Sequence, residues 1–226
     1  MIIEEYDLIE QKEEWNLFIE NSINSNMYQL GEFIDINSYK CDKIKNLVFK
    51  QEDKIIASIS IGIIGKGVAK SPFSSSFAGF NYHNDISLMQ LKNVVETFKR
   101  YCTDNDIEII EICQPPLIYL KHLDEKIDYA LLSNDFILEG YEVCLYKETN
   151  ELSYNIRSNL KRNIKKAESS QLKFKKINNA DECFYFISNQ KKIQSMPFSI
   201  EFNDFNKLNE AYPEKVQMYG VYRDDF

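Results

Sequence analysis

The chain has 226 residues, of which 35 are Asp or Glu and 27 are Lys or Arg, so its formal net charge is -8. With 44% hydrophobic and 27% charged residues, the composition is that of a globular protein with a buried core and excludes a disordered chain. The acidic balance argues against a protein that coats DNA, because such proteins are usually basic.

The predicted elements begin with a short strand at residues 2–5 and a helix at residues 12–21, where Trp15, Phe18 and Ile19 recur at helical spacing. A second short helix is expected near residues 32–39. Residues 45–51 and 54–64 are predicted to form two strands of a hairpin that turns at the polar pair Glu52-Asp53.

Residues 71–84 contain Ser, Pro and Gly in the proportions of a loop. Asp85 or Ser87 can cap a long helix that ends near residue 105. The alternating pattern of residues 107–113 predicts a strand, and a helix is expected near residues 124–133. Residues 136–146 are then predicted to form another strand.

A basic helix follows, with Ser153 as its expected N-cap and an apolar stripe formed by Ile156, Leu160, Ile164 and Ala167. Residues 155–176 hold eight Lys or Arg against one Glu. After this segment we expect a strand at residues 172–177, helices at residues 180–194 and 204–211, and a strand at residues 216–222.

The cysteines, the histidines and the N-terminal residues indicate where in the cell the protein is expected and whether it is expected to bind a metal. The five cysteines are widely spaced without a Cys-x-x-Cys pair, which predicts reduced, buried thiols in a cytoplasmic protein. The acidic N-terminus lacks the apolar stretch of a signal peptide, and the longest apolar run, residues 55–65, is too short for a membrane span. His83 and His122 each precede an Asp by two residues, a pattern more typical of solvated sequence than of metal ligands, so we expect no metal.

A weak internal repeat suggests two related units. In the first part of the chain, a helix-like segment and a strand lead to the charged turn Gln51-Glu52-Asp53-Lys54. The same order occurs near the end of the sequence, where a helix-like segment and a strand lead to Tyr222-Arg223-Asp224-Asp225. We therefore expect one α/β unit at residues 1–148 and the N-terminal part of a second at residues 149–226. The second is expected to be incomplete, and whether this reflects a longer chain or a short form stays open. A terminal strand at residues 216–222 with one free side invites homo-oligomer formation.

Two stretches resemble a known family. The helix Leu160-Lys161-Arg162-Asn163-Ile164-Lys165-Lys166-Ala167, followed by a turn and the strand Leu172-Lys173-Phe174, is similar to the start of the second domain of FemAB-type proteins. The loop Ser71-Pro72-Phe73-Ser74-Ser75-Ser76-Phe77-Ala78-Gly79-Phe80 resembles the proline, aromatic and glycine loop of their first domain. The resemblance implies an α/β (α+β) fold of two GNAT-like (N-acetyltransferase-fold) units, each a mixed, mostly antiparallel sheet with flanking helices.

The resemblance also implies an N-acyltransferase that moves an acyl or aminoacyl group from acyl-CoA or aminoacyl-tRNA to an amine, often on a cell-wall precursor. The amine acceptor would be a small molecule or a peptide. Direct transfer needs an aligned donor, backbone N–H groups for the oxyanion and a base, so no nucleophile is required, and no Gly-x-Ser-x-Gly elbow is present. No catalytic residue is assigned.

The sequence departs from the family in two respects. The central strands of a complete second domain are not found before Phe226, and the string Gly62-Ile63-Ile64-Gly65-Lys66-Gly67 lacks the leading Gln or Arg of an acyl-CoA phosphate loop. We expect that string to be a hairpin turn rather than a phosphate cradle. A non-catalytic binding or regulatory module that keeps the GNAT-like fold is therefore a second hypothesis, and a nucleic-acid-binding protein without enzymatic activity is a third.

The candidate site residues form two groups. The first group lies on the basic helix and would bind an anionic donor such as tRNA: Arg157, Lys161, Arg162, Asn163 and Lys166. The alternative is that these residues form only a solvated face of the helix. The second group lies in and near the serine-rich loop and would line an acceptor cleft: Ser74, Ser75, Phe77, Gly79 and Tyr119. The alternatives are an ordinary connecting loop and, for Tyr119, a side chain that only packs against its neighbours.

Overall fold

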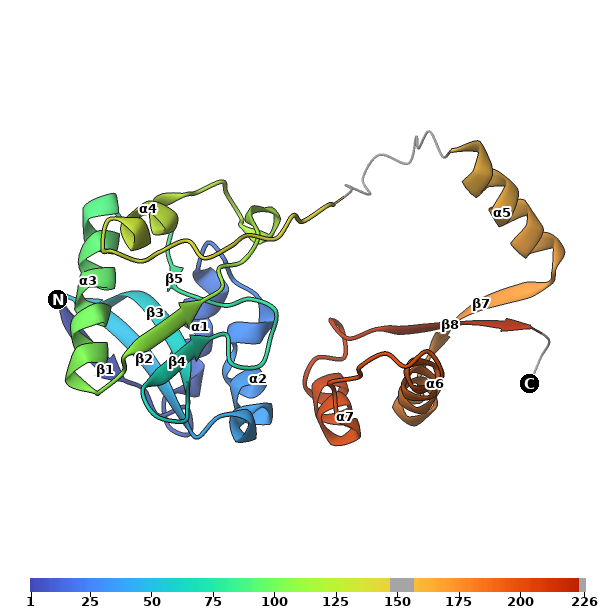
Figure 1. Cartoon of the computed structure of the whole chain (residues 1–226), viewed down its shortest axis with the longest axis horizontal. Coiled ribbons are helices and arrows are strands. Elements are labelled where there is room, and N and C mark those ends of the chain that lie inside the picture. The colour runs from blue at the N-terminus through green and yellow to red at the C-terminus, as the bar shows by residue number, and fades with distance from the viewer. Residues whose placement is uncertain (147–156, 224–226) are drawn as a thin grey trace. The chain divides into compact units, whose positions relative to one another are not determined.

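A computed structural model describes residues 1–146 and 157–223 of the chain (Figure 1). The chain divides into two compact units, Met1–Tyr146 and Lys147–Phe226. The predicted boundary between residues 148 and 149 lies outside the described residues. None of the described helices combines the length and the apolar character needed to cross a membrane.

The first unit is built on a mixed sheet that is mostly antiparallel, as predicted. Its six strands are β1 (Ile2–Glu5), β2 (Lys43–Gln51), β3 (Lys54–Ile64), β4 (Val68–Ser71), β5 (Asn81–Tyr82) and β6 (Ile109–Ile112). The strand order is β1-β2-β3-β4-β6, and β5 pairs with β3 beside this path. The β2–β3 hairpin turns at Glu52 and Asp53, whose φ angles of 50° and 61° suit a two-residue turn that follows the twist of the strands.

The helices of the first unit match the predictions closely. They are α1 (Lys12–Asn21), α2 (Gly31–Ile36), α3 (Leu88–Asp104), α4 (Lys126–Leu132) and three short 3₁₀ turns, η1 (Met27–Gln29), η2 (Ser38–Lys40) and η3 (Leu117–Tyr119). Ser87 caps α3 through a capping box with Gln90, so the second of the two predicted caps is the one used. The short helix expected near residues 32–39 is divided into α2 and η2.

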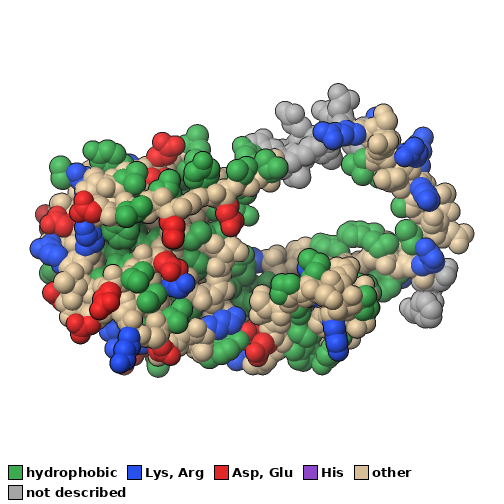
Figure 2. Space-filling model, in the orientation of Figure 1, with side chains coloured by type: hydrophobic (Ala, Val, Ile, Leu, Met, Phe, Trp, Pro, Cys, Tyr) green, Lys and Arg blue, Asp and Glu red, His purple; other side chains and the backbone are tan. Residues whose placement is uncertain are grey.

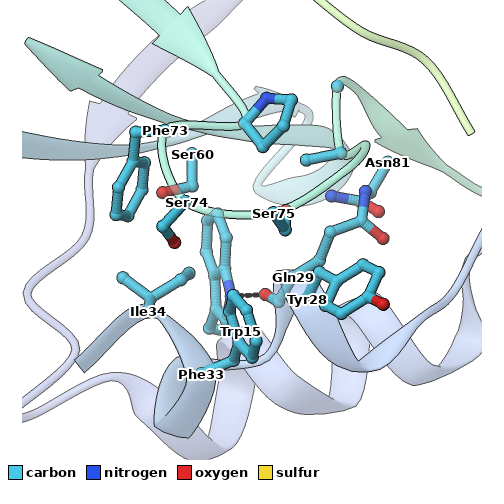
Figure 3. A pocket seen from close by; sticks show the side chains of 13 residues that line it. Trp15, Tyr28, Gln29, Phe33, Ile34, Ser60, Phe73, Ser74, Ser75 and Asn81 are labelled. Carbon is cyan, nitrogen blue, oxygen red and sulfur yellow. Dashed lines mark hydrogen bonds between the residues drawn. The ribbon is translucent and has the colours of Figure 1, made fainter. Parts of the chain in front are cut away.

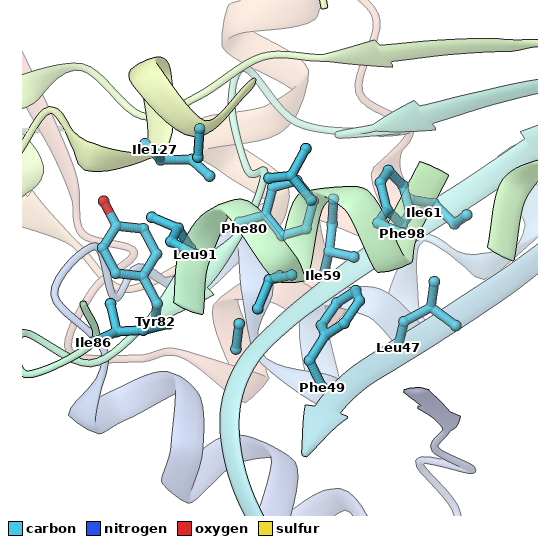
Figure 4. Close-up of a cluster of buried hydrophobic side chains, with 14 of the residues drawn as sticks. Leu47, Phe49, Ile59, Ile61, Phe80, Tyr82, Ile86, Leu91, Phe98 and Ile127 are labelled. Atoms are coloured by element: carbon cyan, nitrogen blue, oxygen red, sulfur yellow. The ribbon is translucent and has the colours of Figure 1, made fainter. Parts of the chain in front are cut away.

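The core lies where α3 packs on the sheet (Figure 4). Phe98 of α3 contacts Phe80 and Phe49, with ring centroids 5.2 Å and 6.5 Å away. Six further side chains of this cluster are fully buried and come from the β2–β3 hairpin and from α3: Leu47, Ile59, Ile61, Leu91, Val94 and Val95. The apolar stripe of α3 therefore fixes the helix to one face of the sheet.

The parallel pairing of β4 with β6 positions the candidate site. The chain leaves β4, crosses through β5 and α3, and returns as β6 alongside β4, with Val68 opposite Ile109 and Ser71 opposite Ile112. The loops that follow the two strands therefore leave the same edge of the sheet. The sequence pattern predicts no element at residues 68–70 and a loop at residues 71–84, so it anticipates neither β4 nor β5.

The predicted strand at residues 136–146 is wrong. The segment is irregular, and its apolar side chains are largely exposed, with Ile137 at 88% and Leu145 at 91%. Alternating β-branched and aromatic residues stabilise a strand only where a neighbouring strand supplies hydrogen bonds and packing. No described strand pairs with this segment.

The second unit consists of α5 (Ser158–Ser169), β7 (Leu172–Ile177), α6 (Ala180–Ile193), α7 (Phe202–Ala211) and β8 (Met218–Arg223). β7 and β8 form an antiparallel pair, with Leu172 opposite Arg223. The order of strand, two helices and antiparallel strand also runs from β1 through α1 and α2 to β2 in the first unit. The expected cap Ser153 and the first stripe residue Ile156 lie outside the described residues. In the described part of the stripe, Leu160 and Ile164 are 52% and 40% exposed.

Candidate functional site

The candidate site lies at the carboxyl ends of β4 and β6, where loops from two adjacent parallel strands meet. This edge of a parallel pair is where open α/β sheets commonly bind ligands. Gly79 of the first loop and Gln114 of the second are in contact, and each lines a different hollow. The two hollows are called here the serine-loop hollow and the acidic hollow.

The serine-loop hollow lies between the loop after β4 and the helical segment α1–α2 (Figure 3). Its free space is about 10 Å³, enough for roughly one water molecule. Trp15 forms one wall, and its Nε1 donates a hydrogen bond of 2.9 Å to the Gln29 carbonyl oxygen. The lining is aromatic and neutral: Trp15, Tyr28, Gln29, Phe33, Ile34, Ser60, Pro72, Phe73, Ser74, Ser75, Ala78, Gly79 and Asn81.

Buried amide groups of this hollow lack hydrogen-bond partners. Asn81 is 1% exposed, and neither of its side-chain amide atoms has a partner among the described residues. Gln29 Nε2 is likewise unpartnered within the described part of the chain. Because buried polar groups are normally hydrogen-bonded, these amides indicate a place where water or a polar ligand group binds.

The structure brings the predicted loop residues together. Ser74, Ser75 and Gly79 line the serine-loop hollow, and the Phe77 ring lies 5.0 Å from the ring of Tyr119. The Phe77 ring also contacts that of Tyr28 at 5.3 Å. Sequence reasoning missed Gln29 and Asn81 and assigned Trp15 only to a helix face, since nothing in the local pattern marks them as neighbours of this loop.

The acidic hollow is much larger, with about 400 Å³ of free space. It lies between the segment after β6, helix α4 and residues 141–146. None of the residues that line it is Lys or Arg: Asn24, Tyr82, Gln114, Pro115, Pro116, Leu117, Ile118, Leu120, Asp124, Ile127, Asp128, Tyr141, Glu142, Cys144 and Tyr146. A volume of this size suits a small organic ligand.

The carboxylates of the acidic hollow differ in their partners. Asp124 accepts hydrogen bonds from the Lys126 backbone N–H at 2.7 Å and pairs with Lys126 Nζ at 3.1 Å. The carboxylate of Asp128 makes no hydrogen bond or ion pair with any described residue. Partial burial, together with the neighbouring charge of Glu125, raises the pKa of Asp128 above its ordinary value. A carboxylate without a partner and with a raised pKa is a candidate for binding or proton transfer.

Two buried residues that line the acidic hollow, Tyr82 and Asn24, have side-chain oxygens without a hydrogen-bond partner among the described residues. Tyr82 is 1% exposed, and its hydroxyl has no hydrogen-bond partner in the described ranges. Burial, followed by the charges of Asp124 and Asp128, raises the pKa of Tyr82. Asn24, also 1% exposed, donates from Nδ2 to the Phe80 carbonyl oxygen at 2.6 Å, whereas its Oδ1 is unpartnered within residues 1–146 and 157–223.

The predicted donor-binding residues lie on α5 in the second unit. Arg157 occupies the N-cap position, and Lys161, Arg162, Asn163 and Lys166 are exposed along the helix. Figure 2 shows the Lys and Arg side chains along this helix. None of the four basic side chains forms an ion pair with another described residue. Both interpretations of this face, anion binding and simple solvation, therefore stay open.

The cysteines and histidines form no metal centre in the described part of the chain. No group of three His, Cys, Asp or Glu side chains there could hold a metal ion. The His83 ring instead stacks on Phe18 at 4.6 Å. All five cysteines are free, but the expectation that they are buried holds only for Cys102 and Cys183. Cys113 and Cys144 are exposed, and Cys144 lies in the irregular segment that was predicted as a strand.

Comparison with known proteins supports the fold. The chain matches no protein-family model and no curated protein sequence. One similar solved structure is an aminoglycoside antibiotic 6′-N-acetyltransferase from Acinetobacter haemolyticus, which is 12% identical in sequence. The match covers 67% of this chain and 100% of the acetyltransferase chain. Its TM-score of 0.39 is too low to support an inference. The crystal structure of FemX matches with a TM-score of 0.63 and 9% identity over 98% of this chain. The chain spans 57% of the FemX chain, and the two share a fold.

Proposed function

We propose that the protein transfers an acyl or aminoacyl group to an amine that binds in the acidic hollow. The FemX-like fold and the resemblance of two sequence stretches to FemAB-type proteins support the reaction class. The observation that carries the proposal is the partner-free carboxylate of Asp128 in a 400 Å³ hollow at the carboxyl ends of β4 and β6. Neither the donor nor the acceptor follows from the fold, because one fold supports many reactions.

The chemistry required is direct aminolysis. The amine nitrogen attacks the donor carbonyl carbon, a C–N bond forms, and the C–S bond of a thioester or the C–O bond of an aminoacyl ester breaks. The leaving group departs with the electron pair as a thiolate or alkoxide, and the proton that the amine nitrogen loses passes to a base, which returns it to the leaving group. Asp128 fits the role of base, since burial raises its pKa toward the range in which a carboxylate accepts protons effectively.

The donor would be held through its phosphates by the basic face of α5. Arg157, Lys161 and Lys165 recur every four residues and so share one side of the helix, with Arg162 and Lys166 on the adjacent side. Arg forks and Lys point charges are the groups that bind phosphate. The exposure of these side chains leaves them accessible to such a ligand. Acyl-CoA and aminoacyl-tRNA are both phosphate-bearing donors of this kind.

A transfer assay tests the proposal. The full chain is incubated with 1,5-diaminopentane and either acetyl-CoA or aminoacyl-tRNA, and the amide product is measured by mass spectrometry. We expect product with one of the donors, a large loss of product in Asp128→Asn, and wild-type product in the charge-matched control Glu96→Gln on the exposed side of α3. Amine binding without product from either donor would contradict acyl transfer and favour a non-catalytic binding module.

A further inference from the structure

We infer that the acidic hollow binds the ammonium group of a small aliphatic amine, which deepens the proposed function by naming the chemical class of its acceptor. The carboxyl groups of Asp124, Asp128 and Glu142 line the hollow, and no basic residue does. Only Asp124 has a cationic partner among the described residues, Lys126. The hollow therefore carries uncompensated negative charge that favours a cation over a neutral or anionic ligand.

The buried polar atoms point to an ammonium group in particular. An ammonium carries three N–H donors and no acceptor, so its site must supply several oxygen acceptors. Asn24 Oδ1 is buried without a partner among the described residues, and the Asp128 carboxylate and the Tyr82 hydroxyl line the same hollow with no hydrogen bond to a described residue. Asn24 is almost fully buried, and leaving its Oδ1 buried and unpartnered is costly unless water or a ligand satisfies it.

The rest of the lining suits an aliphatic chain. Pro115, Leu117 and Ile118 provide apolar surface on one element, and Tyr141 and Tyr146 add aromatic rings from another. Aromatic faces attract cations, so these tyrosines also favour an amine. The described carboxylates do not converge in a group of three that would hold a metal ion, which favours an organic cation over a divalent metal.

Isothermal titration calorimetry with 1,5-diaminopentane tests the site, with 1,5-pentanediol as the uncharged ligand of equal length and Mg²⁺ as the competing cation. We expect the diamine to bind at least about tenfold more tightly than the diol, because charged hydrogen bonds are worth about a factor of ten or more. Mg²⁺ is expected to leave diamine binding unchanged. Equal affinity for diamine and diol, or displacement of the diamine by millimolar Mg²⁺, would overturn the inference.

Three variants test which side chains contribute to diamine affinity. Asp128→Asn should weaken diamine binding about tenfold, and Tyr82→Phe, which keeps the ring, should weaken it roughly threefold to tenfold. Glu96→Gln removes the same charge from exposed α3 and should change affinity less than twofold. If Asp128→Asn binds as wild type does, the hollow is not the amine site. Thermal unfolding of each variant shows whether a loss of binding reflects a loss of fold.

A chemical readout is independent of transfer activity. Cys144 lines the hollow and is exposed, so N-ethylmaleimide should modify it and bound diamine should slow that reaction. Cys41 of the same unit does not line the hollow and is the internal control. Protection of Cys144 without acyl transfer would sink the proposed function but leave this inference standing. Transfer without protection of Cys144 would overturn this inference and the placement of the acceptor in the hollow, but would leave the acyl-transfer reaction itself standing.

Discussion

A methyl group on Gly79 would lie 2.5 Å from Gln114 Oε1, so these two residues fit together only because Gly79 has no side chain. Gly79 also has a φ of +82°, a conformation that other residues rarely adopt. The contact joins the loop after β4 to the segment after β6. Gln114 lines the acidic hollow and Gly79 the serine-loop hollow, so this contact joins a residue of one hollow to a residue of the other.

Gly79→Ala should therefore disturb the site as well as the fold. Gly65 supplies a matched control, because it also has positive φ, +62°, but a methyl group there would meet nothing within 4 Å. We expect both substitutions to lower the free energy of unfolding by about 1–2 kcal/mol through backbone strain. Only Gly79→Ala should also displace Gln114 and alter diamine binding. Urea unfolding and calorimetry measure the two effects, and identical ligand binding in both variants would contradict a structural role for the Gly79–Gln114 contact in the hollow.

The basic face of α5 is tested by Arg162→Ala combined with Lys166→Ala. If this face binds phosphates, tRNA affinity should fall and the slope of log K against log salt should decrease by about 2, roughly one unit for each lost contact. The free energy of unfolding should change by no more than about 1 kcal/mol, because both side chains are exposed. Filter binding at two salt concentrations gives the slope.

The control for that experiment removes two exposed lysines from the other helices of the second unit, Lys192→Ala with Lys207→Ala. Its net charge change is the same. A salt slope that falls equally in the control and in the α5 variant would show that net charge, rather than this helix face, attracts tRNA.

Diamine affinity should fall in acid because Asp128 must be ionised to bind an ammonium group. Burial raises the pKa of Asp128, so its folded form takes up a proton at a higher pH than an ordinary Asp, whose value is 3.8. Affinity should be greatest above this raised pKa and decline as pH falls through it, while the amine itself stays protonated. The other charged or titratable groups that line the hollow or neighbour Asp128 come from residues 124–126, β5 and residues 141–146: Asp124, Glu125, Lys126, Tyr82, Tyr141, Glu142, Cys144 and Tyr146.

Calorimetry from pH 7 to pH 4 measures this decline. Asp128→Asn should bind weakly throughout and lose most of the acid dependence. An acid decline of wild-type size in Asp128→Asn would assign the titration to another carboxylate, Glu142 or Asp124.

The packing of α3 on the sheet predicts a large effect for Phe98→Ala. Phe98 is fully buried between Phe80 and Phe49, so its removal should lower the free energy of unfolding by about 3–5 kcal/mol. Leu88→Ala, at the exposed start of the same helix, should cost less than about 1 kcal/mol. Chemical denaturation of both variants provides the comparison. Equal losses would mean that the α3 face assigned to the core is wrong.

Local chemistry determined much of the first unit and of the helices of the second. The apolar spacing of Trp15, Phe18 and Ile19 predicted α1 with its observed bounds, and Ser87 and Gln90 set the start of α3. Glu52-Asp53 placed the hairpin turn. Each of these signals acts between residues that are close in sequence, so the sequence alone is sufficient to specify the element. The composition of residues 71–84 likewise marked the loop beside the serine-loop hollow.

Tertiary structure decided the rest. The sequence pattern of residues 136–146 favours a strand, yet no strand forms, because pairing depends on a free sheet edge that residues far away in sequence must supply. The parallel pairing of β4 with β6 depends equally on α3 returning the chain to the same edge. Asn24, Tyr82 and Asp128 come from three separate parts of the sequence, and only the folded chain places their unpartnered polar atoms around one hollow.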